Sequence, residues 1–221
     1  MLPSEPSNGK FELSKDSREL LIVYTIAIVS FTVIFNDRTI SFWLKFCFMN
    51  LVLAVLALIL DGNRILTKIR KGITEWKQTF WRSGIWAFMI YFSLWAVHFY
   101  GLVMILTYLD QLDEIYRLLA PENRLFLLIS SAIIGPCEEI FWRGYFQQKM
   151  EDVQGNPSSA LLTSSLLYAF VFISKGNLIL FTGLFLAGLI MGFLYKKYRV
   201  IIDSALCHGF LYILVLVVFP L

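Results

Sequence analysis

Apolar residues fall into seven long runs that are separated by short polar connections. Most of these runs approach the roughly 20 residues that a helix needs to cross the hydrocarbon core of a bilayer. The runs cover residues 20–35, 40–60, 83–109, 125–148, 158–174, 178–195 and 201–219. Helices satisfy their own backbone hydrogen bonds in lipid, so the pattern predicts an all-α polytopic membrane helix bundle with about seven transmembrane helices.

The connection between the second and third runs has a helical pattern of its own. Its apolar residues recur every three or four positions, which places them on one stripe of a helix, and basic residues occupy other positions. The stripe consists of Ile65, Ile69, Ile73, Trp76 and Phe80. The pattern predicts an interfacial amphipathic helix at 64–82 that lies on membrane lipids. A solvated connecting helix is the alternative.

Composition and charge agree with a membrane protein. The chain is 58% hydrophobic and 16% charged, whereas soluble domains are about half apolar and a quarter charged. A net charge of +3 gives no reason to expect nucleic acid as a partner. The polar tail at 1–19 lacks the order of a secretory signal.

Lysine and arginine are distributed unequally between the two sides. The N-terminal tail and the even-numbered connections hold 13 of them, and the opposite side holds 4. By the positive-inside rule, this bias predicts a cytoplasmic N-terminus and a C-terminus outside, in the cytoplasmic (inner) membrane of a prokaryote.

The fourth run contains three charged residues, Glu138, Glu139 and Arg143, in the stretch "GPCEEIFWRGYF". Each ionised side chain near the bilayer centre costs about 2.5–3.5 kcal/mol on insertion scales. Glu139 and Arg143 are spaced i, i+4 and can pair on one face. Glu138 has no partner in its own helix, and such a buried carboxyl group can accept or donate a proton. The alternative is a buried Glu–Arg clamp that only fixes helix packing.

Of the two histidines, His208 lies about 12 Å into the seventh run, and Glu138 lies about 15 Å deep in the fourth. The similar depths predict that both side chains reach one hydrated cavity. An imidazole there can hydrogen-bond a carboxylate, a water or a developing oxyanion. His98, near the middle of the third run, is interpreted as a packed polar residue. Asp203 is expected to cap the start of the last helix.

Three stretches resemble the CPBP family of intramembrane proteases, which comprises CAAX proteases and bacteriocin-processing enzymes and is also called Abi. "EEIFWRGYF" is similar to its EExxxR motif, and "SSLLYAF" to the start of its FxxxH motif. "GLIMGFLYKKYRVIIDSALCHGFLY" resembles its glycine-rich helix, basic turn and HxxxN motif. The resemblance extends from about residue 125 to the end of the chain.

The resemblance implies a role for each matching residue. Glu138 would activate a water for attack on a peptide bond, Glu139 and Arg143 would hold the site, and His208 would stabilise the oxyanion. The resemblance also implies a helical bundle that is open toward the cytoplasm and a lipid-anchored or transmembrane peptide as substrate. We therefore divide the chain into the tail 1–19, N-terminal transmembrane helices at 20–109 and a CPBP-like catalytic core at 110–221.

The chain departs from the family pattern at two positions. Phe172 stands where the family has the second-motif histidine, and Tyr212 where it has asparagine. A tyrosine hydroxyl can still donate to an oxyanion, so Tyr212 joins the candidate catalytic residues. Phenylalanine cannot act as an imidazole, and nothing in the sequence brings His98 into its place.

No cofactor is certain from the sequence. The family is often labelled as metalloprotease, and zinc usually takes three protein ligands from histidine, cysteine and carboxylate side chains. Glu139 and His208 are the candidate ligands, with Cys137 or Cys207 as the remaining sulfur donors within reach.

Three functions remain open at this point. The first is an intramembrane endopeptidase, and the second is a catalytically weakened pseudoprotease that binds a membrane partner without cleavage. The third is a small transporter or proton relay, since a glutamate at depth suits that role as well. The absence of an inverted repeat in the sequence argues against the third.

Overall fold

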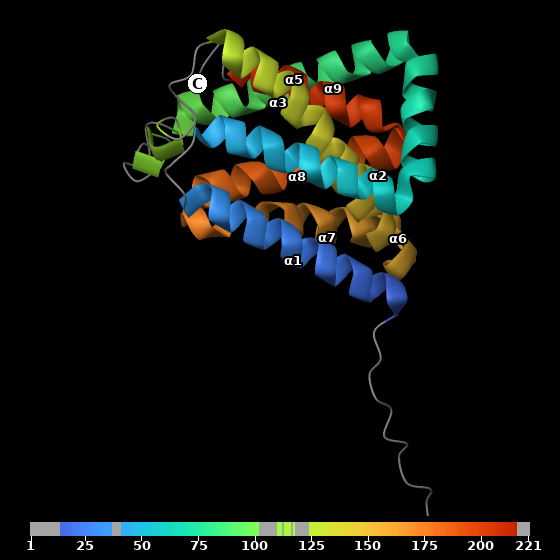
Figure 1. The fold of residues 1–221 in the computed structure, drawn as a ribbon. Helices are drawn as coiled ribbons and strands as arrows, with labels where there is room; N and C mark the ends of the chain where they lie inside the picture. Colours follow the sequence, from blue (N-terminus) through green and yellow to red (C-terminus); the bar gives the residue numbers. More distant parts are fainter. Residues whose placement is uncertain are drawn as a thin grey trace, which may run out of the picture.

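The structure is a computed structural model that describes residues 14–36, 41–101, 110, 111, 113–115, 117 and 124–215. Every regular element in these ranges is a helix, which confirms the all-α membrane bundle (Figure 1). The helices are α1 (Lys15–Asn36), α2 (Phe42–Thr74), α3 (Trp76–Gly101), α5 (Arg124–Glu139), a π-helix (Ile140–Gln147), α6 (Gln148–Gln154), α7 (Pro157–Phe170), a 3-10 turn (Ile173–Lys175), α8 (Leu178–Tyr198) and α9 (Ile201–Ile213).

Five helical segments within the described residues are long and apolar enough to cross a membrane. They are Lys15–Asn36, Phe42–Thr74, Leu125–Gln154, Pro157–Lys175 and Leu178–Tyr198. They correspond to the first, second, fourth, fifth and sixth predicted runs. The third and seventh runs extend beyond the described parts of α3 and α9, so the number seven stays a prediction.

Helix α2 consists of two arms that meet at Asp61. The backbone of Asp61 has φ −144° and ψ 38°, which lies outside the helical region. In Figure 1 the first arm runs through the middle of the bundle, and the second turns across its end and leads to α3. The bend lies where the sequence predicts the change from a membrane span to the amphipathic segment.

The amphipathic segment does not present its apolar residues as one stripe. Ile65 is fully buried in the core, whereas Ile73 and Trp76 are about 60% exposed. Gly72 explains the difference, because a Cβ atom there would lie 2.7 Å from Cγ1 of Val200. This close approach to the start of α9 turns the face with Ile65 and Gly72 toward protein. The predicted stripe is therefore divided, because Ile65 lies in the core and the helix is interrupted between Thr74 and Trp76, and its contact with membrane lipids stays a prediction.

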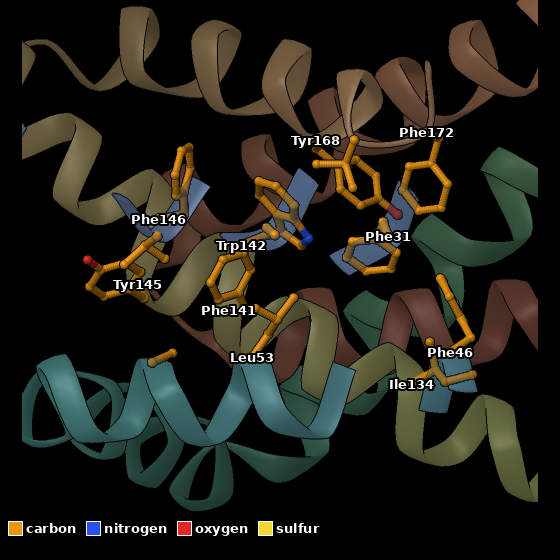
Figure 2. Packing of buried hydrophobic residues seen from close by; sticks show 14 of the residues in the cluster. Phe31, Phe46, Leu53, Ile134, Phe141, Trp142, Tyr145, Phe146, Tyr168 and Phe172 are labelled. Atoms are coloured by element: carbon orange, nitrogen blue, oxygen red, sulfur yellow. The ribbon is translucent and has the colours of Figure 1, made fainter. Parts of the chain in front are cut away.

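Aromatic side chains fill the space between α1, α2, the π-helix and α7 (Figure 2). The figure labels Phe31, Phe46, Leu53, Ile134, Phe141, Trp142, Tyr145, Phe146, Tyr168 and Phe172. The segment from α5 through the π-helix to α6 lies at the centre, because it packs on α2, α7 and α9. The predicted charged residues of this segment are therefore buried by protein on several sides.

Candidate active site

Helices α5 and α9 cross at closely packed backbones, and this crossing positions the candidate site. A Cβ atom on Gly135 would lie 3.0 Å from the backbone nitrogen of Gly209. Such a contact leaves no room for a side chain at Gly135. The glycine therefore allows Glu138 and Glu139, about one turn later on α5, to meet His208 of α9.

The polypeptide changes its helical form directly after the two glutamates. Pro136 lies inside α5, and the chain continues as a π-helix from Ile140 to Gln147. Seven of the eight π-helical residues, Phe141 to Gln147, are buried. Proline removes a backbone donor, and π-helical segments are rare and often occur at functional sites. The π-helix begins about one turn downstream of Pro136.

Glu139 is fully buried between a cation and an imidazole. Its Oε2 lies 3.2 Å from Nε of Arg143, and its Oε1 lies 3.0 Å from Nδ1 of His208. Arg143 also donates from Nη2 to the carbonyl oxygen of Gly188 on α8, at 2.9 Å. The 3.2 Å contact is an ion pair without hydrogen-bond geometry. The i, i+4 pair expected from the sequence is thus present and is anchored to a third helix.

Glu138 is also fully buried, but it has no arginine of its own. Its Oε2 lies 3.3 Å from the hydroxyl of Tyr168, 3.4 Å from Nε2 of His208 and 3.5 Å from the hydroxyl of Tyr212. Its Oε1 has no hydrogen-bond partner among the described residues. One oxygen is therefore surrounded by donors, and the other is buried without a hydrogen-bond partner among the described residues.

His208 links the two carboxylates. Its Nδ1 faces Glu139 and its Nε2 faces Glu138, and its side chain is only 6% exposed. The ring stacks on Tyr212, with ring centroids 4.7 Å apart and planes inclined by 21°. The convergence that the matching depths predict is present, as a direct contact between Glu138 and His208.

An apolar cavity of about 400 Å³ lies between α3, α7, α8 and α9. Its wall consists of Trp86, Met89, Ile90, Ser93, Leu94, Tyr168, Gly183, Leu184, Leu186, Ala187, Ile190, His208, Leu211, Tyr212 and Val215. This volume falls in the range of small-molecule sites, about 300–1,000 Å³. Glu138 is not part of the wall, because Tyr168, His208 and Tyr212 lie between its carboxylate and the cavity. The prediction that Glu138 and His208 both reach one hydrated cavity is therefore wrong for Glu138, since His208 lines this mainly apolar cavity and Glu138 does not.

Phe172, at the position of the expected histidine, belongs to an aromatic cluster. Its ring centroid lies 5.3 Å from those of Phe31 and Phe35 and 6.2 Å from that of Phe46. It also lines a second cavity of about 90 Å³, together with Tyr212. Its side chain therefore offers the site apolar surface and no hydrogen bond.

Sequence reasoning missed Tyr168 as a site residue. Tyr168 occupies the aromatic position of the second motif, one turn before Phe172, and it is 1% exposed. The sequence did contain a signal for it. Tyr168 carries a hydroxyl donor four residues, or about one helical turn, before the position of the missing histidine.

Asp203 and His98 are two further polar residues for which the sequence gives an expectation. Asp203 does not cap α9, since the start of that helix has no side-chain cap. Its carboxylate is fully buried and lies 3.2 Å from Nη2 of Arg82 on α3. Because this ion pair orients the Asp203 carboxylate toward Arg82, the prediction that Asp203 caps the start of α9 is wrong. The side chain of His98 lies outside the described residues.

The donor set does not fit a zinc site. Among the described residues no group of three or more histidine, cysteine or acidic side chains is arranged to hold a metal ion. Both ring nitrogens of His208 face carboxylates, so neither is directed toward a shared metal position. We therefore derive no reaction step that passes through a metal.

One family model matches part of the chain. Residues 120–214 match the family model described as type II CAAX prenyl endopeptidase Rce1-like. No curated protein and no solved structure matches the chain. The matched segment contains the EExxxR stretch, Tyr168, Phe172 and His208, and it confirms the resemblance that the motifs predict.

Proposed function

We propose that this chain, which is Rce1-like over residues 120–214, is an intramembrane endopeptidase of the CAAX-protease and bacteriocin-processing type. It cleaves a membrane-anchored peptide or protein with a water that Glu138 activates. One observation carries the proposal: a fully buried carboxylate contacts His208 and two tyrosine hydroxyls directly beside an apolar cavity.

The proposed reaction begins when a water enters beside Oε1 of Glu138, which is buried in the free protein. The carboxylate takes a proton from the water, and the water oxygen attacks the carbonyl carbon of the substrate peptide bond. The carbonyl oxygen becomes an oxyanion, which accepts hydrogen bonds from Nε2 of His208 and the hydroxyl of Tyr212. The carbon–nitrogen bond then breaks, and Glu138 returns its proton to the leaving amine.

Glu139 and Arg143 support this chemistry indirectly, through His208. Glu139 accepts a hydrogen bond from Nδ1 of His208 and thereby fixes the orientation of the imidazole. Donation from Nε2 to the oxyanion at the same time requires protons on both ring nitrogens. Arg143 balances the charge of Glu139 and attaches the pair to α8 through Gly188.

The 400 Å³ cavity is the proposed binding site for the apolar part of the substrate. Its wall is formed mainly by aliphatic and aromatic side chains, and its polar contributions include His208 and the two tyrosines. A lipid anchor or an apolar peptide segment buries its surface there, and the scissile bond lies against the polar end. Membrane lipids and such a lipid-anchored or transmembrane peptide are therefore the proposed partners.

The proposed orientation in the cytoplasmic membrane has the N-terminus in the cytoplasm. In support of this orientation, one basic residue from each even-numbered connection pairs with an acidic residue of α1 or α6. The pairs are Lys149 with Asp16, Arg64 with Asp152 and Arg199 with Glu151.

A pseudoprotease that binds a membrane partner without cleavage is the second candidate. Two observations favour it. Phe172 packs among aromatic rings and supplies no proton-transfer group, and Glu138 is covered by Tyr168, His208 and Tyr212. Under this reading the cavity still binds a lipid-anchored segment.

The test uses purified protein in liposomes with a panel of prenylated, acylated and transmembrane peptides. Glu138→Gln keeps the shape of the side chain but cannot act as a base. Glu19→Gln is the matched control, because the Glu19 carboxylate also accepts a bond from a buried tyrosine, away from the site. We expect cleavage that Glu138→Gln abolishes and Glu19→Gln retains.

The other outcomes separate the two candidates. Peptide binding without cleavage by the wild type supports the pseudoprotease and contradicts the peptidase. A protein that neither binds nor cleaves any peptide of the panel contradicts both.

A further inference from the structure

Tyr168 is held rigidly on three sides. Its ring packs edge-on against Trp142, with centroids 5.2 Å apart, and the guanidinium of Arg143 lies 5.3 Å from its ring centroid. On α8, Gly188 approaches so closely that an added Cβ would lie 3.3 Å from Cδ1 of Tyr168. These neighbours leave the ring little freedom, so the position of its hydroxyl is fixed by packing.

The hydroxyl of Tyr168 lies between the candidate base and the cavity. It donates to Oε2 of Glu138 at 3.3 Å, and the side chain also contributes to the cavity wall. Tyr212 donates to the same oxygen from α9 at 3.5 Å. Both bonds are longer than the 2.5–2.7 Å usual for a hydroxyl on a carboxylate. Catalytic hydrogen bonds are often long before substrate binds and shorten in the complex.

The donors are distributed very unequally over the Glu138 carboxylate. Oε2 faces Tyr168, Tyr212 and His208, whereas Oε1 has no partner among the described residues. A carboxylate held through one oxygen presents the other in a fixed direction. Since Tyr212 is only partly buried and His208 is needed at the oxyanion, Tyr168 is the most rigid of the three donors.

From this geometry we infer that Tyr168 is a positioning residue for the proposed reaction. Its hydroxyl holds Oε2 of Glu138, so that Oε1 is directed toward the attacking water. Tyr168 lies on α7, about one turn before Phe172 in the chain. It supplies a hydrogen bond to Glu138, whereas Phe172 supplies none. The inference rests on the proposed function for its catalytic consequence, but the hydrogen bond itself can be tested separately.

The first experiment compares Tyr168→Phe with Tyr145→Phe in the liposome cleavage assay. Both substitutions remove a hydroxyl from a buried ring, and the Tyr145 hydroxyl donates to Glu19 at 2.8 Å, away from the site. We expect Tyr168→Phe to lower kcat by about 10- to 100-fold, in line with the loss of a hydrogen bond to a charged group. KM should change less than about threefold, because the ring still lines the cavity.

The second experiment measures the Glu138 carboxylate itself and requires no turnover. Infrared difference spectra against Glu138→Gln isolate its stretching bands in the wild type, in Tyr168→Phe and in Tyr145→Phe. Loss of a donor to Oε2 should shift these bands in Tyr168→Phe and leave them unchanged in Tyr145→Phe.

The two measurements keep the inference and the proposed function apart. If no peptide is cleaved by the wild type, the proposed function fails, and a shifted carboxylate band in Tyr168→Phe still supports the positioning of Glu138. An unshifted band overturns the inference whatever the activity. A Tyr168→Phe protein that cleaves at the wild-type kcat also overturns it.

Discussion

Two buried charged clusters share α9 but differ in how their charges are balanced. Around Arg82, one guanidinium lies 3.2 Å from the fully buried Asp203 and 3.5 Å from Glu75, which is one-third exposed. The same guanidinium lies 4.5 Å from the ring centroid of Tyr198. At depth, this cluster therefore contains one carboxylate for one cation.

The cluster around Arg143 contains a second carboxylate at the same depth. Glu138 and Glu139 are both fully buried, but only Glu139 lies against the arginine. Burial of an unpaired charge is unfavourable unless hydrogen bonds or a proton compensate it. One bundle thus holds two kinds of cluster: Arg82 joins α3 to α9 in an ion pair, while Arg143 leaves Glu138, the proposed general base, without a cation.

The largest expected effect separates the two clusters by activity. Glu138→Gln should reduce cleavage by about 10²–10⁴-fold, the usual contribution of a general base. Asp203→Asn should leave the rate of the folded protein close to wild type, because Asp203 pairs with Arg82 and makes no contact with the cavity. Initial cleavage rates in liposomes measure both. Equal losses in the two variants would remove the distinction between the clusters.

The next effect concerns stability. Arg143→Met should lower the free energy of unfolding by about 3–5 kcal/mol, because it leaves the buried Glu139 carboxylate without its cation. Arg82→Met should cost less, because the Arg82 side chain is 22% exposed, against 3% for Arg143, so water screens its ion pair more strongly. Unfolding in mild detergent, followed by tryptophan fluorescence, ranks the two. A larger loss for Arg82→Met would contradict the assignment of the deeper charge to Arg143.

A glycine pair tests the crossing that brings the site together. Gly135→Ala should cost about 3 kcal/mol, near the upper end of overpacking effects, because its new Cβ would meet the backbone of Gly209. Gly209→Ala is the matched control, since a Cβ there has nothing within 4 Å. The same unfolding assay compares them, and cleavage by Gly135→Ala should fall as Glu138 and His208 separate. Equal stabilities would show that α5 and α9 are less closely packed.

The smallest effect concerns the position of the missing histidine. Phe172→His should cost about 1–2 kcal/mol, because it places an imidazole among aromatic rings that offer no partner. Cleavage should not rise, since the new side chain remains in the aromatic cluster. Thermal unfolding and the liposome assay are the measurements. A gain in cleavage rate would mean that residue 172 reaches Glu138 directly.

The sequence predicted those features that depend on spacing along one helix or on the bilayer. The ion pair of Glu139 and Arg143 follows from four-residue spacing, and the contact of Glu138 with His208 follows from equal depth in two spans. Both constraints apply before any packing is known. The bend at Asp61 was likewise visible as a change from an apolar run to an amphipathic one.

Which helix faces meet, and at what distance, was decided only by tertiary structure. The partner of Asp203 lies 121 residues away, Gly72 turns Ile65 inward by its approach to Val200, and the Tyr168 hydroxyl reaches Glu138 across an interhelical contact. Periodicity along a helix defines its faces but not their neighbours. The chain alone therefore determined a buried, charged and membrane-embedded helix. Close packing of α5, α7, α8 and α9 decided that Oε2 of Glu138 faces the hydrogen-bond donors and that Oε1 has no partner among the described residues.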